Sequence, residues 1–287
     1  MAMTVRKAVI LVAGFGTRFL PVTKAVPKMM LPVLDTPVLH LAVSEAVSAG
    51  IEDVIFVVSK MQESIESYFN SETKLKKVLG KPGNELFLEK IHAIPSVEMR
   101  FVYQHEQLGV GHAVLMAKEA VGDEPFALFF PDDVIWDEIP TIGRMIEIFE
   151  EKRTPVLAAK EVSDEMVPNL GIIEHSAEEG RLYQVTDLVE KPSLIDAPSN
   201  LAIIGRYVLT PEIFDALETT EPGVLGEIQI TDAIRKLLNL QSVYSYRFPG
   251  YHIDTGTPVG LLKASIHAAL QRDDLASDLR SWLGDQF

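Results

Sequence analysis

The sequence predicts an α/β fold with a mostly parallel, mixed sheet flanked by helices and a smaller β-rich part in the second half. Three observations lead to this prediction. Through about residue 160, apolar runs of buried-strand length alternate with segments of helical periodicity, which is typical of parallel strands covered by helices. From about residue 165 the strand-like runs become longer, and we expect some of them to pair antiparallel. Hydrophobic residues make up 47% of the 287 residues, enough to bury a substantial core.

The first half supplies the parallel strands and the helices between them. The expected strands are short apolar runs bounded by turn residues, at 8–12, 54–58, 101–104, 125–130 and 155–159. The expected helices are at 37–49, 62–69 and 111–120. Four residues recur in step along the first helix: Leu41, Glu45, Ala46 and Ala49. Gly50 follows as its stop, since glycine commonly ends a helix.

The second half is expected to be richer in strands. Its expected strands are at 171–174, 182–189, 201–209 and 243–247, and its expected helices are at 230–238, 258–270 and 273–287. The helix at 230–238 carries its apolar residues on one face, as a helix packed on a core does. No internal repeat and no low-complexity linker divides the chain. We therefore expect one domain over residues 1–287, with a first part of about 1–160 and a second part of about 161–287.

The composition excludes several classes of function. A formal net charge of −15 argues against a nucleic-acid partner, because binding a phosphate backbone requires a basic surface. No apolar run approaches the length of a membrane span, so we expect no membrane association. There is no cysteine, which excludes disulfides and thiolate chemistry. The chain starts directly with a strand pattern, so we expect no signal peptide and a cytoplasmic location.

Charge is unevenly distributed along the chain. The first 34 residues carry five basic residues and no acidic one, and Asp35 is the first acid. In an acidic protein, such a segment indicates a site for a small, highly charged anion. The alternative is that these basic residues are solvated surface groups without a ligand.

A glycine loop follows the first expected strand at residues 14–21, with the sequence GFGTRFLP. Glycines directly after a buried strand let the backbone approach a ligand and offer N–H groups to phosphate oxygens. It is neither a dinucleotide fingerprint, because Phe19 replaces the third glycine, nor a Walker loop, because no Gly-Lys-Ser/Thr follows. The pattern suits a triphosphate that loses pyrophosphate, with Arg18 near the leaving group and Lys28 near the α-phosphate. The alternative is that the glycines only turn the chain.

Two aspartates are candidate ligands of a hard cation. Asp132 follows a strongly apolar expected strand, at the edge where open α/β sheets bind their ligands. Asp254 stands between an apolar strand residue and a glycine turn. Mg²⁺ prefers carboxylate and phosphate oxygens and usually takes only one or two protein ligands. Either aspartate could instead be an ordinary turn or cap residue, and Asp133 could share or take over metal binding.

The second half carries polar groups suited to a sugar phosphate. Glu190 and Lys191 end an expected strand side by side and are predicted to point to opposite faces. Lys191 can hold a phosphate, and Glu190 can accept hydrogen bonds from sugar hydroxyls. Asn200 and Glu227 add an amide and a second acid. Each is by itself more often a solvated surface residue, so the prediction rests on their joint presence.

Several short motifs resemble those of the sugar-phosphate nucleotidyltransferases, and the resemblance runs from about residue 7 to residue 260. The motifs are AGFGTR at 13–18, PVTK at 21–24, PK at 27–28, LGVGHA at 108–113, PD at 131–132, VEKP at 189–192, PSNL at 198–201, GRY at 205–207 and GEIQITDAI at 226–234. The stretch at 108–113 and the last motif resemble the bacterial UTP–glucose-1-phosphate uridylyltransferases more than the thymidylyltransferases.

This resemblance implies a Rossmann-like fold, with a nucleotide-binding first part and a sugar-binding, C-terminally helical second part. A uridylyl group would pass from UTP to glucose 1-phosphate with Mg²⁺ as cofactor, giving UDP-glucose and pyrophosphate. The implied nucleotide-binding residues are Ala13, Gly14, Gly16, Thr17, Gln104 and Gly109, and the implied catalytic residues are Arg18, Lys28 and Lys191. The implied sugar-binding residues are Gly171, Glu190, Lys191, Asn200 and Glu227, and the implied metal ligands are Asp132 and Asp254. We expect a homo-oligomer, either a dimer or a tetramer.

One departure and several alternatives accompany the resemblance. The family often carries an acid after the Pro-Lys pair, where this chain has Met29, so a role for that acid is in doubt while Lys28 is kept. Either dTTP or CTP could replace UTP, or the chain could be a catalytically silent subunit that binds nucleotide sugars. An NAD-dependent dehydrogenase is disfavoured by the missing third glycine. His105 and His112, near the expected base pocket, are interpreted as structural.

Overall fold

The computed structural model describes residues 4–59, 62–69, 79, 83–223 and 226–286. Phe287, the last residue of the expected C-terminal helix, lies outside these residues. Within them, no helix combines the length and the apolarity that crossing a membrane requires.

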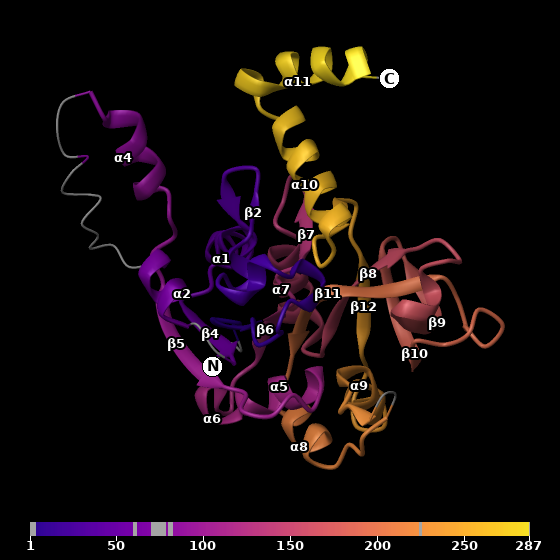
Figure 1. Ribbon diagram of the computed structural model, residues 1–287. Coiled ribbons are helices and arrows are strands. Elements are labelled where there is room, and N and C mark those ends of the chain that lie inside the picture. The colour runs from indigo at the N-terminus through magenta and orange to yellow at the C-terminus, as the bar shows by residue number, and fades with distance from the viewer. Residues whose placement is uncertain (1–3, 60–61, 70–78, 80–82, 224–225, 287) are drawn as a thin grey trace.

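A nine-stranded sheet forms the centre of the molecule (Figure 1). In spatial order its strands are β5 (Glu98–Tyr103), β4 (Asp53–Val58), β1 (Lys7–Leu11), β6 (Phe126–Phe129), β11 (Leu201–Leu209), β8 (Val156–Glu161), β12 (Tyr244–Arg247), β10 (Leu182–Glu190) and β9 (Gly171–Glu179). Among these nine strands, only β10 and β11 run against the common direction. The predicted mostly parallel, mixed sheet is confirmed, and strands from both halves of the chain share it.

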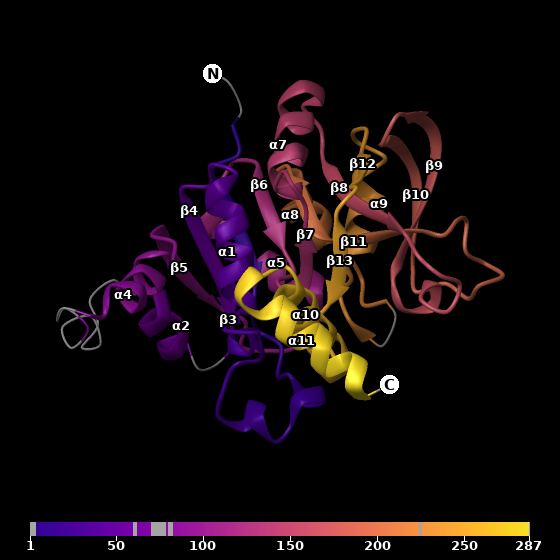
Figure 2. The same cartoon turned by 90° about the horizontal axis from the view of Figure 1, so that it is seen from above.

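Helices cover both faces of the sheet (Figures 1 and 2). Successive strand residues point to opposite faces, so Ala8 and Ile10 of β1 belong to one core and Val9 belongs to the other. The first core is closed by α1 (Val38–Ser48), α2 (Gln62–Phe69), α7 (Thr141–Lys152) and α10 (Pro258–Leu270). The second core is closed by α5 (Val110–Met116), α6 (Lys118–Val121), α8 (Glu212–Glu218) and α9 (Ile230–Leu237). Beyond α10, α11 (Asp273–Gln286) extends away from the sheet.

The antiparallel end of the sheet curls back toward its centre. The hairpin of β9 and β10 forms one edge, yet Ile172 of β9 also pairs with Ala202 of β11. Register shifts in β10 between Gln184 and Asp187 allow this bend, because a bulge increases the local twist of a strand. Gly171 and Glu190, which pair with each other at the end of the hairpin, are thereby brought beside β11.

A short antiparallel ribbon carries Asp254, one candidate metal ligand, and begins directly after Asp132, the other candidate. It consists of β7 (Asp133–Trp136) and β13 (Tyr251–Asp254), and its register places Asp133 opposite Asp254. Asp132 immediately precedes β7, so it lies at the same end of the ribbon as Asp254. A smaller ribbon of β2 (Pro32–Val33) and β3 (Thr36–Pro37) leads from the loop after β1 into α1.

Most expected elements are present close to their predicted bounds, and β11, α2 and α10 coincide with the prediction. The helix expected at 111–120 is divided at Ala117 into α5 and α6. Elements that were not expected include α4 (Glu85–His92), α7, α8, β7 and β13. In α7, buried Ile142, Met145 and Phe149 recur at helical spacing, so its apolar face was visible in the sequence.

Candidate active site

The loop after β1 lies at the carboxyl ends of the parallel strands. Gly16 in this loop has a left-handed backbone with φ of 64°. A Cβ added there would lie 2.8 Å from Lys28 Cβ and 3.0 Å from Thr23 Cγ2. The Thr23 hydroxyl donates to the Gly16 carbonyl oxygen at 2.8 Å. Glycine is therefore favoured at this position by the left-handed backbone and required by the close approach of Lys28 and Thr23.

The other residues of the loop differ in exposure. Ala13 is buried at its base, whereas Gly14, Thr17 and Arg18 are exposed. A Cβ added at Gly14 would meet no atom within 4 Å, so the backbone there is open to a ligand. One guanidinium nitrogen of Arg18 lies 3.5 Å from the carbonyl oxygen of Gly256, which comes from the far end of the chain.

Lys28, Asp132 and Asp254 converge on Gly256. Lys28 Nζ lies 2.7 Å from Asp132 Oδ2. A Cβ added at Gly256 would lie 2.6 Å from Asp254 Oδ1, 3.1 Å from Asp132 Oδ2 and 3.3 Å from Lys28 Nζ. Met29, which stands where the family often has an acid, is buried in the first core and is therefore not part of this cluster. The predicted metal ligands and the predicted α-phosphate lysine are thus brought together.

The two aspartates are held firmly in a crowded setting. Thr255 donates to the backbone carbonyl oxygen of Asp132 through both its N–H and its hydroxyl, each at 2.8 Å. Burial raises the pKa of the Asp254 carboxyl, a hydrogen bond from Gly256 N–H opposes this rise, and the charges of Asp133 and Asp132 add to it. Two crowded carboxylates of this kind suit a divalent cation.

The residues present fit Mg²⁺ only together with other ligands. Within the ranges that the structure describes, no group of three or more His, Cys, Asp or Glu side chains is placed to hold a metal ion. Asp132 and Asp254 supply two carboxylates, and Mg²⁺ commonly binds one or two carboxylates and completes its shell with phosphate oxygens and water.

A second loop follows β5 and contains the two residues predicted to read the base. Gln104 is 3% exposed, and its Nε2 donates to the Gly109 carbonyl oxygen and also lies near His112 Nδ1, both at 3.1 Å. Gly109 has a φ of 106°, and a Cβ added there would lie 2.7 Å from the Ile228 carbonyl oxygen. The backbone of Ile228 also makes two hydrogen bonds of 2.8 Å with this loop. The segment that carries Glu227 is therefore packed on the base loop.

A pocket of 230 Å³ lies between α9 and the curled end of the sheet. Four of the predicted sugar-binding residues line it: Gly171, Glu190, Lys191 and Glu227. Val110, the first residue of α5 after the base loop, and Asp133, the neighbour of Asp132, line the same pocket. The pocket therefore adjoins the end of the base loop, and Asp133 in its wall pairs with Asp254 in the β7–β13 ribbon.

The wall of this pocket explains the glycine at position 171. Glu190 Oε2 accepts a hydrogen bond from the Thr231 hydroxyl at 2.7 Å. A Cβ added at Gly171 would lie 3.0 Å from the Thr231 hydroxyl oxygen and 3.2 Å from Glu190 Oε2. A side chain at position 171 would therefore crowd the Thr231 hydroxyl and the Glu190 carboxylate.

The prediction that Glu190 and Lys191 point to opposite faces is wrong. Lys191 follows the last residue of β10 and has a positive φ of 47°, so the alternation of the strand ends before it. The Lys191 N–H donates to the Leu170 carbonyl oxygen at 3.0 Å. Its Nζ lies 3.5 Å from Glu190 Oε1, and both side chains line the same pocket.

Asn200 lies apart from the sugar pocket, and Asp133 lies near Asp254 but has its carboxylate engaged by another residue. Asn200 is exposed just before β11 and does not line the pocket, so its sugar-binding role stays a prediction. Asp133 Oδ1 lies 2.6 Å from His252 Nε2, and a Cβ added at Gly205 would overlap the other carboxylate oxygen of Asp133. The Asp133 carboxylate is therefore held between β13 and β11.

The sequence analysis missed a buried ion pair beneath the site. Arg206 of β11 is 2% exposed and donates to Glu45 Oε2 of α1 at 2.8 and 3.0 Å. It also donates at 3.0 Å to the carbonyl oxygen of Phe130, two residues before Asp132. Glu45 Oε1 accepts the Ile142 N–H at the start of α7. The signal in the sequence was an acid within the apolar stripe of the helix at 37–49.

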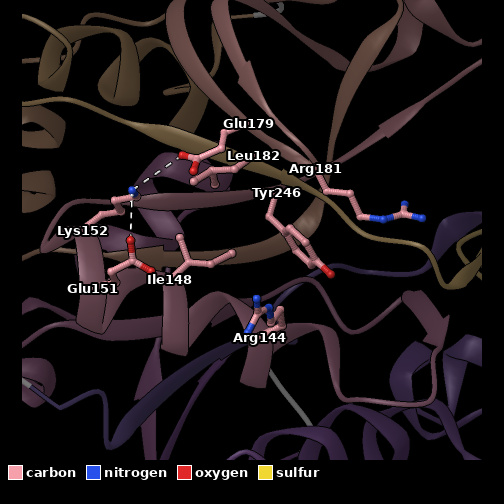
Figure 3. Close-up of a pocket in the computed structure, with 8 residues that line it drawn as sticks. All are labelled: Arg144, Ile148, Glu151, Lys152, Glu179, Arg181, Leu182 and Tyr246. Atoms are coloured by element: carbon pink, nitrogen blue, oxygen red, sulfur yellow. Dashed lines mark ion pairs between the residues drawn. The ribbon is translucent and has the colours of Figure 1, made fainter.

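A second hollow lies away from this site, between α7 and the β9–β10 hairpin (Figure 3). Its walls are formed by Arg144, Ile148, Glu151, Lys152, Glu179, Arg181, Leu182 and Tyr246. Lys152 lies 3.0 Å from Glu151 and 4.0 Å from Glu179, and Arg144 pairs with Glu147. Because acids match most of its basic groups, this hollow lacks the excess positive charge that a polyphosphate requires.

Comparison with known proteins identifies the family. The family model described as nucleotidyl transferase matches residues 7–271. The chain belongs to the nucleotidyl transferase family. The resemblance predicted from the short motifs is confirmed, and the match spans the glycine loop, the base loop and the pocket.

Two similar proteins of this family come from staphylococci. The UTP–glucose-1-phosphate uridylyltransferase of Staphylococcus epidermidis is 44% identical over 280 residues, which are 97% of each chain. The UTP–glucose-1-phosphate uridylyltransferase 2 of Staphylococcus saprophyticus is 44% identical over 276 residues, which are 96% of each chain.

Solved structures of the family have the same fold. A UDP-glucose pyrophosphorylase in complex with UDP-glucose is 37% identical, with a TM-score of 0.84, over 93% of this chain and 100% of that chain. A UTP-bound UGPase from Acinetobacter baumannii is 38% identical, with a TM-score of 0.88, over 97% of this chain and 98% of that chain. The predicted fold class of this chain is therefore confirmed.

Proposed function

We propose that this chain transfers the uridylyl group of UTP to glucose 1-phosphate, giving UDP-glucose and pyrophosphate. The observation that carries the proposal is that Lys28, Asp132 and Asp254 converge on Gly256, while four of the predicted sugar-binding residues line one pocket together with Asp133, the neighbour of Asp132. Relatives that match almost the whole chain are named for this reaction. Similar solved structures hold UTP or UDP-glucose.

Each part of the site binds a different group of the two substrates in this proposal. On the nucleotide side, the open backbone of Gly14, the backbone of Gly16 and Thr17 and the guanidinium of Arg18 meet the β- and γ-phosphates. Lys28 meets the α-phosphate, and Gln104 and Gly109 meet uracil. On the sugar side, Lys191 binds the phosphate of glucose 1-phosphate, and Gly171, Glu190 and Glu227 meet the hydroxyls of glucose.

The proposed reaction needs no protein nucleophile and no general base. The phosphate of glucose 1-phosphate is ionised at neutral pH, so one of its oxygens attacks the α-phosphorus of UTP directly. As this bond forms, the bond from the α-phosphorus to the oxygen that bridges to the β-phosphate breaks, and its electron pair leaves with pyrophosphate. The chain holds two polyanions in line against their repulsion, and Arg18, Lys28 and Lys191 supply the compensating positive charge.

Mg²⁺ is the proposed cofactor, with Asp132 and Asp254 as its protein ligands. The convergence of the two carboxylates on Gly256 supports this assignment. When bound, the ion supplies positive charge to phosphate oxygens. Asp133, whose carboxylate is engaged by His252, is proposed to stay outside the metal set.

Release of pyrophosphate from UTP and glucose 1-phosphate tests the proposal. We expect release that requires both substrates and Mg²⁺. The same assay with CTP and dTTP tests the choice of base, and a faster reaction with either of them would contradict it. A protein that binds UDP-glucose but releases no pyrophosphate would be the silent subunit.

Three further properties are proposed on the sequence alone. They are a cytoplasmic location, a homo-oligomeric state as a dimer or tetramer, and a single domain with a nucleotide-binding part of about 1–160 and a sugar-binding part of about 161–287.

A further inference from the structure

The amide of Gln104 has one orientation. The Gly109 carbonyl oxygen can only accept a hydrogen bond, so the amide group 3.1 Å from it is the nitrogen Nε2 and not the oxygen. The second hydrogen of Nε2 points to His112 Nδ1, also at 3.1 Å. Both hydrogens of the amide thus have acceptors, and a rotation by 180° would set two carbonyl oxygens against each other.

His112 must then present an unprotonated Nδ1. A hydrogen on Nδ1 would face the Nε2 hydrogen of Gln104, so the ring hydrogen lies on Nε2 of the imidazole. His112 stands in the first turn of α5, and the Ala113 N–H of the same turn donates to the Gly109 carbonyl oxygen at 3.2 Å. Both acceptors of the Gln104 amide are therefore fixed by this short segment.

The remaining polar atom of Gln104 is its carbonyl oxygen, Oε1. In the part of the chain that the structure describes, no hydrogen-bond partner is found for Oε1 or for the Gly109 N–H. An acceptor and a donor in one loop complement an N–H beside a carbonyl, which is the imide edge of uracil. Cytosine presents an unprotonated N3 there, so the Gln104 oxygen would face a second acceptor.

We propose that His112 is a positioning residue that selects the base. By accepting from Gln104 Nε2, it keeps Gln104 Oε1 available to the N3–H of uracil and thereby favours UTP over CTP. This inference rests on the proposed function, because it takes Gln104 as the residue that meets the base. Thymine has the same imide edge, so His112 does not separate UTP from dTTP.

The experiment compares UTP with CTP in three variants of the full chain. His112→Leu removes the acceptor, and we expect the ratio of kcat/KM for UTP to that for CTP to fall about tenfold, the fold-change of one hydrogen bond. His112→Asn keeps a side-chain carbonyl acceptor and should restore the ratio to within about threefold of the unmodified protein. His105→Leu changes an exposed histidine of the same segment and should leave the ratio unchanged.

The outcomes separate this inference from the proposed function. If the unmodified protein releases no pyrophosphate from UTP and glucose 1-phosphate, the proposed function fails. If it is active and His112→Leu keeps the ratio, or loses activity equally with both nucleotides, the role of His112 is overturned. In the unmodified protein with ¹⁵N-labelled histidine, NMR should find the ring proton of His112 on Nε2. A proton on Nδ1 overturns the inference even if no variant folds.

Discussion

The phosphate side of the site, which comprises Arg18, Lys28, Asp132 and Asp254 of the nucleotide side, holds its charges differently from the sugar side around Glu190 and Lys191. On the phosphate side, Lys28 Nζ lies 2.7 Å from Asp132, and the lysine side chain is only 15% exposed. On the sugar side, Lys191 Nζ lies 3.5 Å from Glu190, and the lysine side chain is 32% exposed. The charges on the phosphate side are thus locked together before a ligand arrives, whereas Lys191 can still turn toward its ligand. A change on the phosphate side should therefore stop the reaction, and a change on the sugar side should affect mainly one substrate.

The backbone supports the same contrast. The carbonyl oxygen of Asp132 accepts two hydrogen bonds from Thr255, and the buried Arg206 donates a hydrogen bond to the carbonyl oxygen of Phe130. Lys191 lies at the end of β10 in a left-handed conformation, with one backbone hydrogen bond to Leu170. Rigid support of charged groups is what the transfer step requires, because the groups must meet charge as it develops.

The largest expected effect is on the metal aspartates. Asp132→Asn and Asp254→Asn should each lower kcat by about a thousandfold, because the isosteric amide removes a charge from the proposed Mg²⁺ ligand set. Steady-state pyrophosphate release measures the loss, circular dichroism checks the fold, and excess Mg²⁺ should restore activity in part. Asp278→Asn, on exposed α11, is the control. An active Asp254→Asn enzyme would place Asp133 in the metal set and break the comparison.

The same Asp254 variant should not lose stability. Because its pKa is raised in the folded protein, the carboxylic acid contributes stability below its ordinary pKa of 3.8, and this contribution is lost as the pH rises through the folded pKa. At neutral pH the ionised group therefore lowers the free energy of unfolding. In the absence of Mg²⁺ we expect the Tm of Asp254→Asn at pH 7 to equal or exceed that of the unmodified protein.

The next effect concerns the departing pyrophosphate. Arg18→Ala should lower kcat about a hundredfold, because Arg18 meets charge that develops on the leaving group. Binding of UDP-glucose should change by less than about threefold, since that product lacks the leaving group. Calorimetry measures the binding, and Arg6→Ala, a well-exposed arginine, serves as the control. Near-normal turnover of Arg18→Ala would remove Arg18 from the phosphate side.

A smaller and one-sided effect is expected on the sugar side. Lys191→Ala should raise the KM for glucose 1-phosphate about ten- to a hundredfold, the worth of a charge-assisted contact, and should raise the KM for UTP much less. Varying each substrate in turn measures both constants, with Lys263→Ala, a change at an exposed residue of α10, as the control. Equal rises in the two KM values would contradict the division between phosphate side and sugar side.

The smallest effect is expected at Asn200. Its side chain is exposed outside the pocket, so Asn200→Ala should change the KM for glucose 1-phosphate by less than about twofold, as surface substitutions do. The KM of Asn200→Ala is compared with that of Glu190→Gln, a change at a residue that lines the pocket. A rise of about fivefold or more in Asn200→Ala would show that Asn200 binds the sugar, as the sequence resemblance implies.

The sequence by itself determined the features that depend on local rules. The glycine loop after β1 was readable because glycine adopts the left-handed backbone of Gly16 most readily and leaves room for Lys28 to approach. The strands and most helices were readable because the apolar residues repeat with the period of the element. The ribbon of β7 and β13 was missed, since its two short strands pair only with each other, across more than a hundred residues of sequence, and lie outside the central sheet.

Only the tertiary structure decided how distant groups meet. It brought Asp254 to Lys28 and Asp132, joined Glu45 to Arg206, and turned Lys191 to the side of Glu190. A strand pattern alone placed Glu190 and Lys191 on opposite faces, because it contains no information on where a turn of positive φ begins. These contacts depend on the order of the strands in the sheet, on the bend of the β9–β10 hairpin and on the burial of the charged groups. Such properties arise from pairings between segments that are far apart in the chain.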